Sequence, residues 1–240
     1  MTPELMRLSL EKAGLVDCFP EGSLPALTRF SLQMLQINET LNLTKWTRDK
    51  EFLHNHLLDS AYVLPVLKSL VHGPQKWIDL GTGCGFPGVV LGAAFPEVEM
   101  TLMDSMAKKT KALEVCIQAG GWKMKTLTGR AEELGRDSKT REKWDGLTAR
   151  AVADFRVVLE YGLPLIRPGG YLVNWMTADQ TAVVDKAGRA LEILEGKIVK
   201  KVEYSLPNLN QPRSLVFVEK MGKTPPTYPR PVGQASKKPL

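Results

Sequence analysis

A glycine-rich loop carries the residues whose types and spacing most plainly indicate chemistry. The stretch WIDLGTGCGFPG, residues 77–88, contains four glycines after a short apolar run, and GCGFPG matches the dinucleotide-binding pattern G-x-G-x-x-G. Gly81, Gly83 and Gly85 would allow the backbone to approach a ligand closely. Asp104 follows about 20 residues later, where a carboxylate can accept hydrogen bonds from ribose hydroxyls. The loop therefore predicts a site for a cofactor that contains adenosine.

A second carboxylate favours one such cofactor over the others. Asp79 ends the apolar run just before the glycines. Its charge would repel the diphosphate of NAD or FAD, but it would attract the cationic sulfonium and ammonium groups of S-adenosylmethionine. We therefore expect S-adenosylmethionine. An NAD-dependent oxidoreductase using the Gly83–Gly88 loop and Asp104 is the alternative, although all three histidines precede the loop and leave it without a convincing proton donor.

The chemistry of the methyl acceptor is narrowed by what the chain lacks. Transfer from a sulfonium is an in-line displacement, for which a protein mainly positions two reactants. Methylation of adenine N6 or cytosine N4 commonly uses a D/N-P-P-Y/F loop after the fourth strand, where this chain has LTARAVADF, residues 147–155. Attack on cytosine C5 needs a cysteine, typically after proline, and neither Cys84 nor Cys116 follows one. An acceptor with a free lone pair remains, such as guanine N7 or another ring nitrogen.

Two further residues, Glu132 and Arg150, each have both a functional and a structural interpretation. Glu132, in GRAEEL after the third predicted strand, could bind the exocyclic amine of adenine with Phe86 and Ala131 as apolar contacts. It could equally belong to a surface helix with favourable acids in its first turn. Arg150, at the end of the fourth strand, is placed to orient a base or the cofactor, or else to pair with Asp145 or Asp154.

The elements that must position these residues change character near residue 74. Apolar spacing and start signals at Thr2, Ser23 and Asp49 predict helices before that point. Strands then alternate with helices, including one expected over 178–194, and the strands expected at 197–205 and 213–220 follow each other directly. This order predicts an α/β fold with a mostly parallel sheet and an antiparallel hairpin at one edge. The ligand cleft should lie at the carboxyl end of the first strand, beside the glycine loop.

Charge and cysteine content suggest a partner and a compartment. The net charge of +6 arises from residues 200–240, where eight Lys or Arg face two Glu. A positive segment on a neutral body indicates a polyanionic partner, most often nucleic acid, or else a disordered basic tail. We find no membrane-length apolar run, no signal-peptide pattern and no CxxC pair among the three cysteines. We therefore expect a cytoplasmic protein without a metal site or disulfide.

Seven short motifs are spread in order over nearly the whole chain. They are LNLT (41–44), HLLDS (56–60), IDLGTGCGFPG (78–88), DS followed by KK (104–109), GRAEE (129–133), ARA (149–151) and YPRPVGQASKKPL (228–240). Together they resemble the bacterial ribosomal RNA small subunit methyltransferase G family, also called glucose-inhibited division protein B. Many methyltransferases share the glycine loop, whereas HLLDS and the terminal motif are specific to this family.

The resemblance implies a fold, a reaction and a cofactor site. The fold is the Rossmann-like, seven-stranded methyltransferase fold that binds S-adenosylmethionine, with a helical N-terminal extension (1–73), a methyltransferase domain (74–222) and a basic, proline-rich C-terminal tail (223–240). The reaction is methylation of guanine N7 in 16S rRNA, at position 527 in the usual rRNA numbering. The family's cofactor contacts fall on Gly81, Phe86, Ala131, Glu132 and Arg150.

The resemblance also gives roles to residues outside the glycine loop. His56 would shape the acceptor pocket with Asn42 and Asp59, although it could also be an ordinary helix histidine; with Arg150, these three are the candidates for a catalytic role. Residues expected to contact RNA are Lys108, Lys109, Tyr228, Arg230, Lys237 and Lys238. Met176 stands where the family usually has lysine. We expect a monomer acting on 16S rRNA or the small subunit; a non-catalytic RNA-binding protein is a further alternative.

Overall fold

The computed structural model describes residues 1–177, 181–207 and 212–240. It divides into two compact units, the first formed by Met1–Gln75 and Thr82–Thr128, the second by Lys76–Gly81 and Gly129–Leu240. The seven strands form one sheet in the order β3-β2-β1-β4-β5-β7-β6. The number of strands is as predicted. The predicted domain boundaries at residues 73 and 222 stay a prediction. They divide the sequence into continuous ranges, whereas each compact unit combines two separate ranges.

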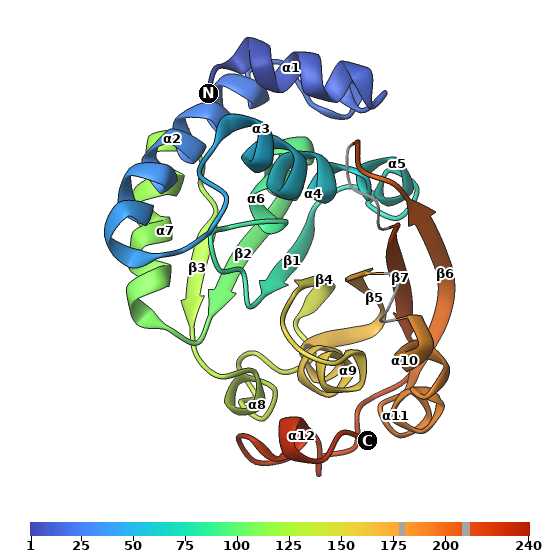
Figure 1. The fold of residues 1–240 in the computed structure, drawn as a ribbon. Helices are drawn as coiled ribbons and strands as arrows, with labels where there is room; N and C mark the ends of the chain where they lie inside the picture. Colours follow the sequence, from blue (N-terminus) through green and yellow to red (C-terminus); the bar gives the residue numbers. More distant parts are fainter. Residues whose placement is uncertain (178–180, 208–211) are drawn as a thin grey trace. The chain divides into compact units, whose positions relative to one another are not determined.

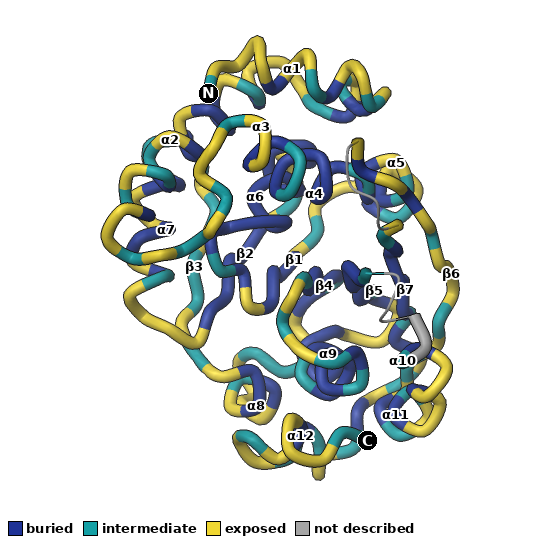
Figure 2. Tube along the Cα trace, viewed as in Figure 1, coloured by how far each residue is buried: buried dark blue, intermediate teal, exposed yellow. Residues whose placement is uncertain are grey.

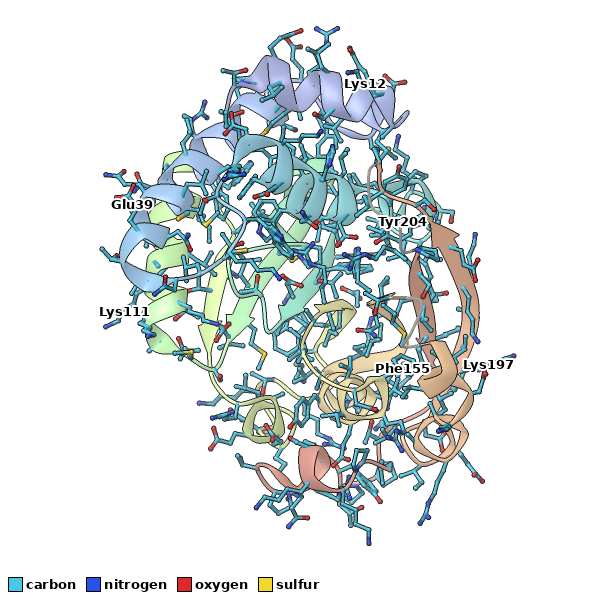
Figure 3. The ribbon with its side chains drawn as sticks, viewed as in Figure 1. Lys12, Glu39, Lys111, Phe155, Lys197 and Tyr204 are labelled. Carbon is cyan, nitrogen blue, oxygen red and sulfur yellow. The ribbon has the colours of Figure 1, made fainter. Side chains whose placement is uncertain are left out.

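The first unit opens with two helices, α1 (Pro3–Lys12) and α2 (Ser23–Leu41), separated by a single turn, η1 (Val16–Cys18). Thr2 caps α1 as predicted, since its Oγ1 accepts a hydrogen bond from Leu5 N at 3.2 Å. Ser23 differs from expectation: it is the first helical residue, and its hydroxyl donates to Ala93 O at 2.9 Å instead of capping the helix. Lys12 and Glu39, near the ends of the two helices, point outward (Figure 3).

A third helical stretch runs from Asp49 to Leu67 in four pieces. They are α3 (Asp49–Phe52), the π-helix η2 (Leu53–Leu58), α4 (Asp59–Ala61) and α5 (Leu64–Leu67). The predicted start at Asp49 is confirmed, although the Asp49 carboxylate pairs with the Met1 ammonium at 2.7 Å rather than capping the helix. A π-helical turn is rare and frequently marks a functional site. Apolar spacing gave no sign of it, because it resembles the surrounding α-helix.

The rest of the first unit is an α/β segment around the glycine loop. Its elements are α6 (Gly88–Ala94), β2 (Val98–Asp104), α7 (Ala107–Gly120) and β3 (Lys125–Thr128), and β2 and β3 pair in parallel. Helices α2 and α7 lie side by side (Figure 1). Arg29 of α2 donates to Ala119 O and Gly120 O at 3.0 and 3.2 Å, and so satisfies the free carbonyls at the end of α7.

The second unit holds the remaining five strands. They are β1 (Gln75–Leu80), β4 (Trp144–Arg150), β5 (Ile166–Thr177), β6 (Gly196–Tyr204) and β7 (Arg213–Lys220). β1, β4 and β5 pair in parallel, whereas β7 pairs antiparallel with both β5 and β6. Figure 2 shows β4, β5 and β7 mostly buried and β6 mostly exposed. The expected mostly parallel sheet with an antiparallel hairpin at one edge is confirmed.

Short helices accompany these strands. They are α8 (Ala131–Leu134), α9 (Phe155–Gly162), η3 (Leu163–Leu165), α10 (Thr181–Asp185), α11 (Gly188–Ile193) and α12 (Gln234–Lys237). Asp154 caps α9 as predicted, accepting from Arg156 N at 2.9 Å. The helix expected over 178–194 is two helices, α10 and α11, over the part that the structure describes; residues 178–180 lie outside that part.

Candidate functional site

The glycine loop of the first unit is held in a tight turn by its own backbone and by the end of β2. Thr82 N donates to Met103 O at 2.8 Å, and Gly85 N donates to Thr82 O at 2.9 Å. Gly85 has a φ of 100°, and a Cβ atom there would lie 2.7 Å from the Phe30 ring. Only glycine combines this backbone conformation with such close packing. The tight turn therefore explains Gly85 before any ligand is considered.

Asp104 ends β2 and faces the loop. Its Oδ2 accepts a hydrogen bond from Gly83 N at 3.2 Å, and its Oδ1 accepts one from Met106 N at 3.0 Å. The side chain is buried, and Lys109 Nζ lies 3.6 Å from Oδ2. The structure therefore brings Asp104 together with Gly83, as the sequence predicted, and adds Lys109, which the sequence singled out separately. It also gives Lys109 a carboxylate partner that the sequence did not predict.

His56 lies in η2 and packs against the glycine loop. Its ring stacks on Phe86 with the centroids 5.0 Å apart, and its Nε2 lies 3.7 Å from Cys84 Sγ. Trp46 and Phe52 meet the ring edge-on at 5.1 and 4.9 Å between centroids. His56 is only 3% exposed. The imidazole is therefore a buried support of the loop, and the sequence did not predict that Cys84 and Trp46 would join it.

Hydrogen bonds from α2 fix the position of this histidine. Asn38 Oδ1 accepts from Thr44 N at 2.7 Å, and Asn38 Nδ2 donates to Thr44 O at 3.0 Å. Thr44 Oγ1 in turn lies 2.8 Å from His56 Nε2. Of the other predicted pocket residues, Asn42 follows α2 with an exposed side chain and a φ of 49°, and Asp59 is buried at the start of α4. The motif LNLT pointed to the right segment, but Asn38, which holds it, was missed.

In the second unit, a buried carboxylate lies near the end of β1. Asp79 is fully buried, and its Oδ1 accepts a hydrogen bond from Thr148 Oγ1 at 2.6 Å across the β1–β4 pairing. Burying a charged carboxylate is costly unless it is paired or hydrogen-bonded. Gly81 follows with a φ of 65°, and a Cβ atom there would lie 3.0 Å from Val152. The end of β1 therefore combines a buried acid with backbone that leaves little room for a side chain.

Arg150 ends β4 and is half-buried. The two acids that the sequence offered as structural partners are each engaged with another arginine. Asp145 Oδ1 lies 2.6 Å from Arg167 Nε, and Asp154 Oδ1 lies 3.0 Å from Arg156 Nε. Each of the two acids therefore already has an arginine partner, Arg167 for Asp145 and Arg156 for Asp154.

The two residues of α8 that were predicted to contact adenine, Ala131 and Glu132, are both buried. Glu132 is only 4% exposed, so it is not the surface residue that the structural alternative expected, although it does lie in the first turn of α8 with Glu133. Its Oε1 accepts a hydrogen bond from Gly233 N at 3.0 Å. This partner lies 101 residues further along the chain, and no local pattern in the sequence could indicate it.

The C-terminal segment, residues 223–240, follows a defined path that ends in α12, so the alternative of a disordered tail is wrong. Arg230 pairs with the fully buried Glu160, with 2.6 Å between Nη2 and Oε2. Hydrogen bonding to Glu160 raises the pKa of the Arg230 guanidinium above its ordinary value. Tyr228 is half-buried, whereas Lys237 and Lys238 are exposed. The residues predicted to contact RNA therefore divide into an inward-facing and an outward-facing group.

Burial raises the pKa of the Cys116 thiol to about 12, so this cysteine stays protonated and is a poor nucleophile. All three cysteines are free.

Met176, which stands where the family usually has lysine, lies buried in β5 opposite Ser214. Within residues 1–177, 181–207 and 212–240, His, Cys, Asp and Glu form no group of three suited to a metal ion. No helix in the same described ranges has the length and apolar character needed to cross a membrane.

The chain is similar to known rRNA methyltransferases. The family model for rRNA small subunit methyltransferase G (GidB) matches residues 23–211. The ribosomal RNA small subunit methyltransferase G of Acetivibrio thermocellus is 40% identical over 204 residues, which are 85% of this chain and 83% of that protein. That of Desulfitobacterium hafniense is 38% identical over 235 residues, 98% of this chain and 93% of that protein. These relatives give no support to an NAD-dependent oxidoreductase.

Solved structures agree on the fold. The ribosomal protein L11 methylase of Lactobacillus delbrueckii subsp. bulgaricus has a TM-score of 0.52 and 14% identity, covering 68% of this chain and 79% of that one. A methyltransferase from Pyrococcus furiosus has a TM-score of 0.52 and 12% identity, covering 81% of this chain and 98% of that one. The fold is that of methyltransferases, and the chain belongs to the rRNA small subunit methyltransferase G family.

Proposed function

We propose that this protein transfers the methyl group of S-adenosylmethionine to N7 of a guanine in 16S rRNA, at position 527 in the usual rRNA numbering. It would do so as a cytoplasmic monomer, with 16S rRNA or the small ribosomal subunit as its partner. The observation that carries the proposal is the glycine loop whose Gly83 N–H is bonded to the Asp104 carboxylate. Membership of the family supports the choice of rRNA as the substrate.

The proposed cofactor contacts are considered in each unit by itself. In the first unit, Asp104 would bind the ribose hydroxyls, Gly83 would let the backbone approach the ligand closely, and Gly85 would keep the loop in its tight turn. Phe86, held by the stack on His56, would supply an apolar contact. These residues fit the nucleoside part of the cofactor, because they combine a positioned carboxylate with backbone that approaches closely.

In the second unit, Asp79 and Gly81 would face the cationic methionine part of the cofactor. Ala131 and Glu132 would lie along the adenine, and Arg150 would orient the base or the cofactor. The buried Asp79 carboxylate suits a sulfonium and an ammonium group better than a diphosphate. The donor set therefore fits S-adenosylmethionine.

The reaction makes modest chemical demands on the side chains. S-adenosylmethionine supplies an electrophilic methyl group, and the N7 lone pair of guanine forms the new bond while the carbon–sulfur bond breaks. No proton needs to be removed from N7, so the protein's task is to place the two reactants in line. We propose that His56, Asn42 and Asp59 shape the acceptor pocket, and we assign no general base.

RNA would be bound by the exposed cations. Lys237, Lys238 and Lys108 are exposed, and Lys109 and Tyr228 are half-buried. Lysines on a surface can neutralise phosphates, and an aromatic ring can stack on an unpaired base. Arg230 is held by Glu160, so any contribution to RNA binding would come from the part of its side chain that stays accessible.

Calorimetric titration tests the cofactor assignment. We expect S-adenosylmethionine to bind with a Kd in about the micromolar range, and NAD or NADH not to bind. Gly83→Asp should abolish binding because it adds a carboxylate beside Asp104. Gly73→Asp is the matched control, since Gly73 has a similar φ of 70° but open space around it. Tight binding of NAD, or equal binding by the Gly83→Asp variant, would refute the assignment.

A further inference from the structure

The helix α8 is too short to keep its own conformation. It has four residues, and even helices of about 12 residues are marginal in isolation. Its backbone hydrogen bonds include those from Leu134 N to Arg130 O, at 3.0 Å, and from Gly135 N to Ala131 O, at 2.8 Å, and so span little more than one turn. Contacts from elsewhere in the second unit must therefore order α8, which carries Ala131 and Glu132.

Two arginines just after α8 bind the backbone of the C-terminal segment, which passes α8 and α9 (Figure 1). Arg136 donates to Pro229 O at 2.7 Å and to Thr227 O at 3.2 Å. Arg141 donates to Gly135 O at 2.6 Å, and its other bonds reach the carbonyls of Thr224, Pro225 and Tyr228, at 2.6, 3.2 and 2.8 Å. Charged donors make such bonds roughly twice as strong as neutral ones. Arg141 thus joins the end of α8 directly to the C-terminal segment.

The same segment also contacts α8 through packing and through Glu132. A Cβ atom on Gly135 would lie 2.9 Å from Pro229 Cγ, so the proline ring packs directly on the end of the helix. At the start of the helix, Glu132 Oε1 accepts the hydrogen bond from Gly233 N. Both ends of α8 are therefore fixed by residues between Thr224 and Gly233.

The C-terminal segment can fix α8 because the segment is itself held by hydrogen bonds to α9. Glu160, on α9, accepts hydrogen bonds from Arg230 N at 2.8 Å and from Arg230 Nε at 2.9 Å, in addition to the Nη2 contact. Arg230 Nη2 also donates to Lys238 O at 2.9 Å. The hydroxyl groups of Tyr161 and Ser236 lie 2.9 Å apart. The segment therefore clamps α8 against a well-packed helix.

We propose that residues 224–233 are a positioning element of the cofactor site: they hold α8 in the conformation that binds S-adenosylmethionine, in addition to any contact that Lys237 and Lys238 make with RNA. This inference rests on the proposed function, because it takes Ala131 and Glu132 as cofactor contacts. Coupling of this kind is reciprocal, so binding of the cofactor must in turn stabilise the segment.

The test uses two substitutions that loosen the contact without touching a proposed ligand residue. Gly135→Ala places a methyl group against Pro229, and Arg136→Met removes the two bonds to the segment. Gly188→Ala is the matched control for the first, because a Cβ atom there meets nothing within 4 Å. Arg136→Lys is the conservative partner of the second, since it keeps one charged donor.

Two measurements are made on each full-length variant. Hydrogen exchange at the amide of residue 135 reports the order of α8, and calorimetry gives the Kd for S-adenosylmethionine. In Gly135→Ala and Arg136→Met, we expect faster exchange and a Kd raised about tenfold, which corresponds to about 1.4 kcal/mol. The KM for S-adenosylmethionine should rise with little change in kcat, since a positioned binding element affects the bound ground state and the transition state alike. Arg136→Lys should recover part of the affinity, and Gly188→Ala should match the wild type.

The outcomes separate this inference from the proposed function. If exchange at residue 135 is unchanged in both variants, the segment does not order α8 and the inference is wrong. If exchange is faster but the Kd is unchanged, α8 is loosened without consequence for the cofactor, and the inference is again wrong. If the wild-type protein does not bind S-adenosylmethionine at all, it is the proposed function that fails.

Discussion

The sequence predicted a cofactor site at the glycine loop (82–88) and RNA contacts in the C-terminal segment (223–240). The structure agrees with these two predictions to different degrees. In the loop, Gly83 meets Asp104, the acid that the sequence had paired with it. In the C-terminal segment, the basic residues were expected to face RNA, but Arg230 turns inward to Glu160. Among the predicted RNA contacts in this segment, Lys237 and Lys238 are exposed, whereas Tyr228 and Arg230 are half-buried.

The difference lies in what determines each role. The loop is defined by its backbone, and its glycines are required by turns within a few residues and by the adjacent strand β2. A long cationic side chain has no such local determinant. Its role depends on which distant acid or phosphate it meets, and Glu160 is 70 residues away from Arg230. Net charge therefore indicates a class of partner but does not say which charged residues contact it.

Replacing Arg230 should have the largest effect on stability. Arg230→Met leaves the Glu160 carboxylate buried without its cation, so we expect the free energy of unfolding to fall by about 3–5 kcal/mol. Denaturant titration checks this, with Lys237→Met as an exposed control that should change it by less than about 0.5 kcal/mol. Normal stability together with weakened RNA binding would instead place Arg230 on the RNA surface, as the sequence suggested.

Lys220 is a second basic residue of the positively charged region 200–240 that faces inward, because it is fully buried. Its ammonium donates to Leu194 O at 2.7 Å and to Thr224 Oγ1, and burial lowers the pKa to about 8 from 10.5. Between these pH values the unfolded chain binds more protons than the folded one, so this group makes the protein more stable as pH rises from about 8 to about 10.5.

The expected change in the free energy of unfolding over this range is about 3 kcal/mol, because the pKa of Lys220 is about 2.5 lower in the folded protein. It is measured as the difference between the wild type and Lys220→Met in denaturant titrations at several pH values, because other groups also titrate in this range. We expect the free energy of unfolding of the wild type to gain on that of the variant as pH rises. A constant difference would mean that Lys220 titrates normally and is accessible to water.

His56 tests the loop side of the comparison. His56→Ala removes the ring that stacks on Phe86, and we expect the Kd for S-adenosylmethionine to rise about tenfold. His56→Phe keeps an aromatic ring in place, so its Kd should rise by less than about threefold. Calorimetry separates the two. If the alanine variant binds like the wild type, the loop does not depend on this support from η2.

The smallest expected effect concerns the two exposed lysines. The double variant Lys237→Ala/Lys238→Ala should reduce the salt dependence of RNA binding by roughly one to two in slope, since each lysine neutralises about one phosphate. The Kd for S-adenosylmethionine should stay the same. Lys197→Ala/Lys200→Ala on β6 is the matched control, because both lysines are exposed and Lys197 points outward (Figure 3). An equal loss of slope in both variants would show that RNA binding is not localised to the C-terminal segment.

The sequence predicted those features that depend on nearby residues. β2 and β7 begin and end where expected, and the caps at Thr2 and Asp154 form as their positions indicated. Apolar alternation and side-chain capping are local effects, so a single sequence contains them. The match between Gly83 and Asp104 was also predicted, because the G-x-G-x-x-G fingerprint includes an acid about 20 residues after the loop.

What the sequence could not indicate depends on contacts over long separations or on small deviations in geometry. The bond between Glu132 and Gly233 joins parts of the chain that nothing in either segment connects. Asn38 supports His56 through Thr44, but an asparagine inside a helix has many possible roles. The π-helix η2 has the apolar spacing of an α-helix, so its extra residue per turn leaves no trace in the pattern.

The most direct test of the central claim is mass spectrometry of 16S rRNA from cells with and without the gene. If the protein methylates guanine N7, N7-methylguanosine at position 527 should be present with the gene and absent without it. Restoring the gene should return the modification, and restoring it with Gly83→Asp should not. Unchanged N7-methylguanosine in cells that lack the gene would contradict the claim.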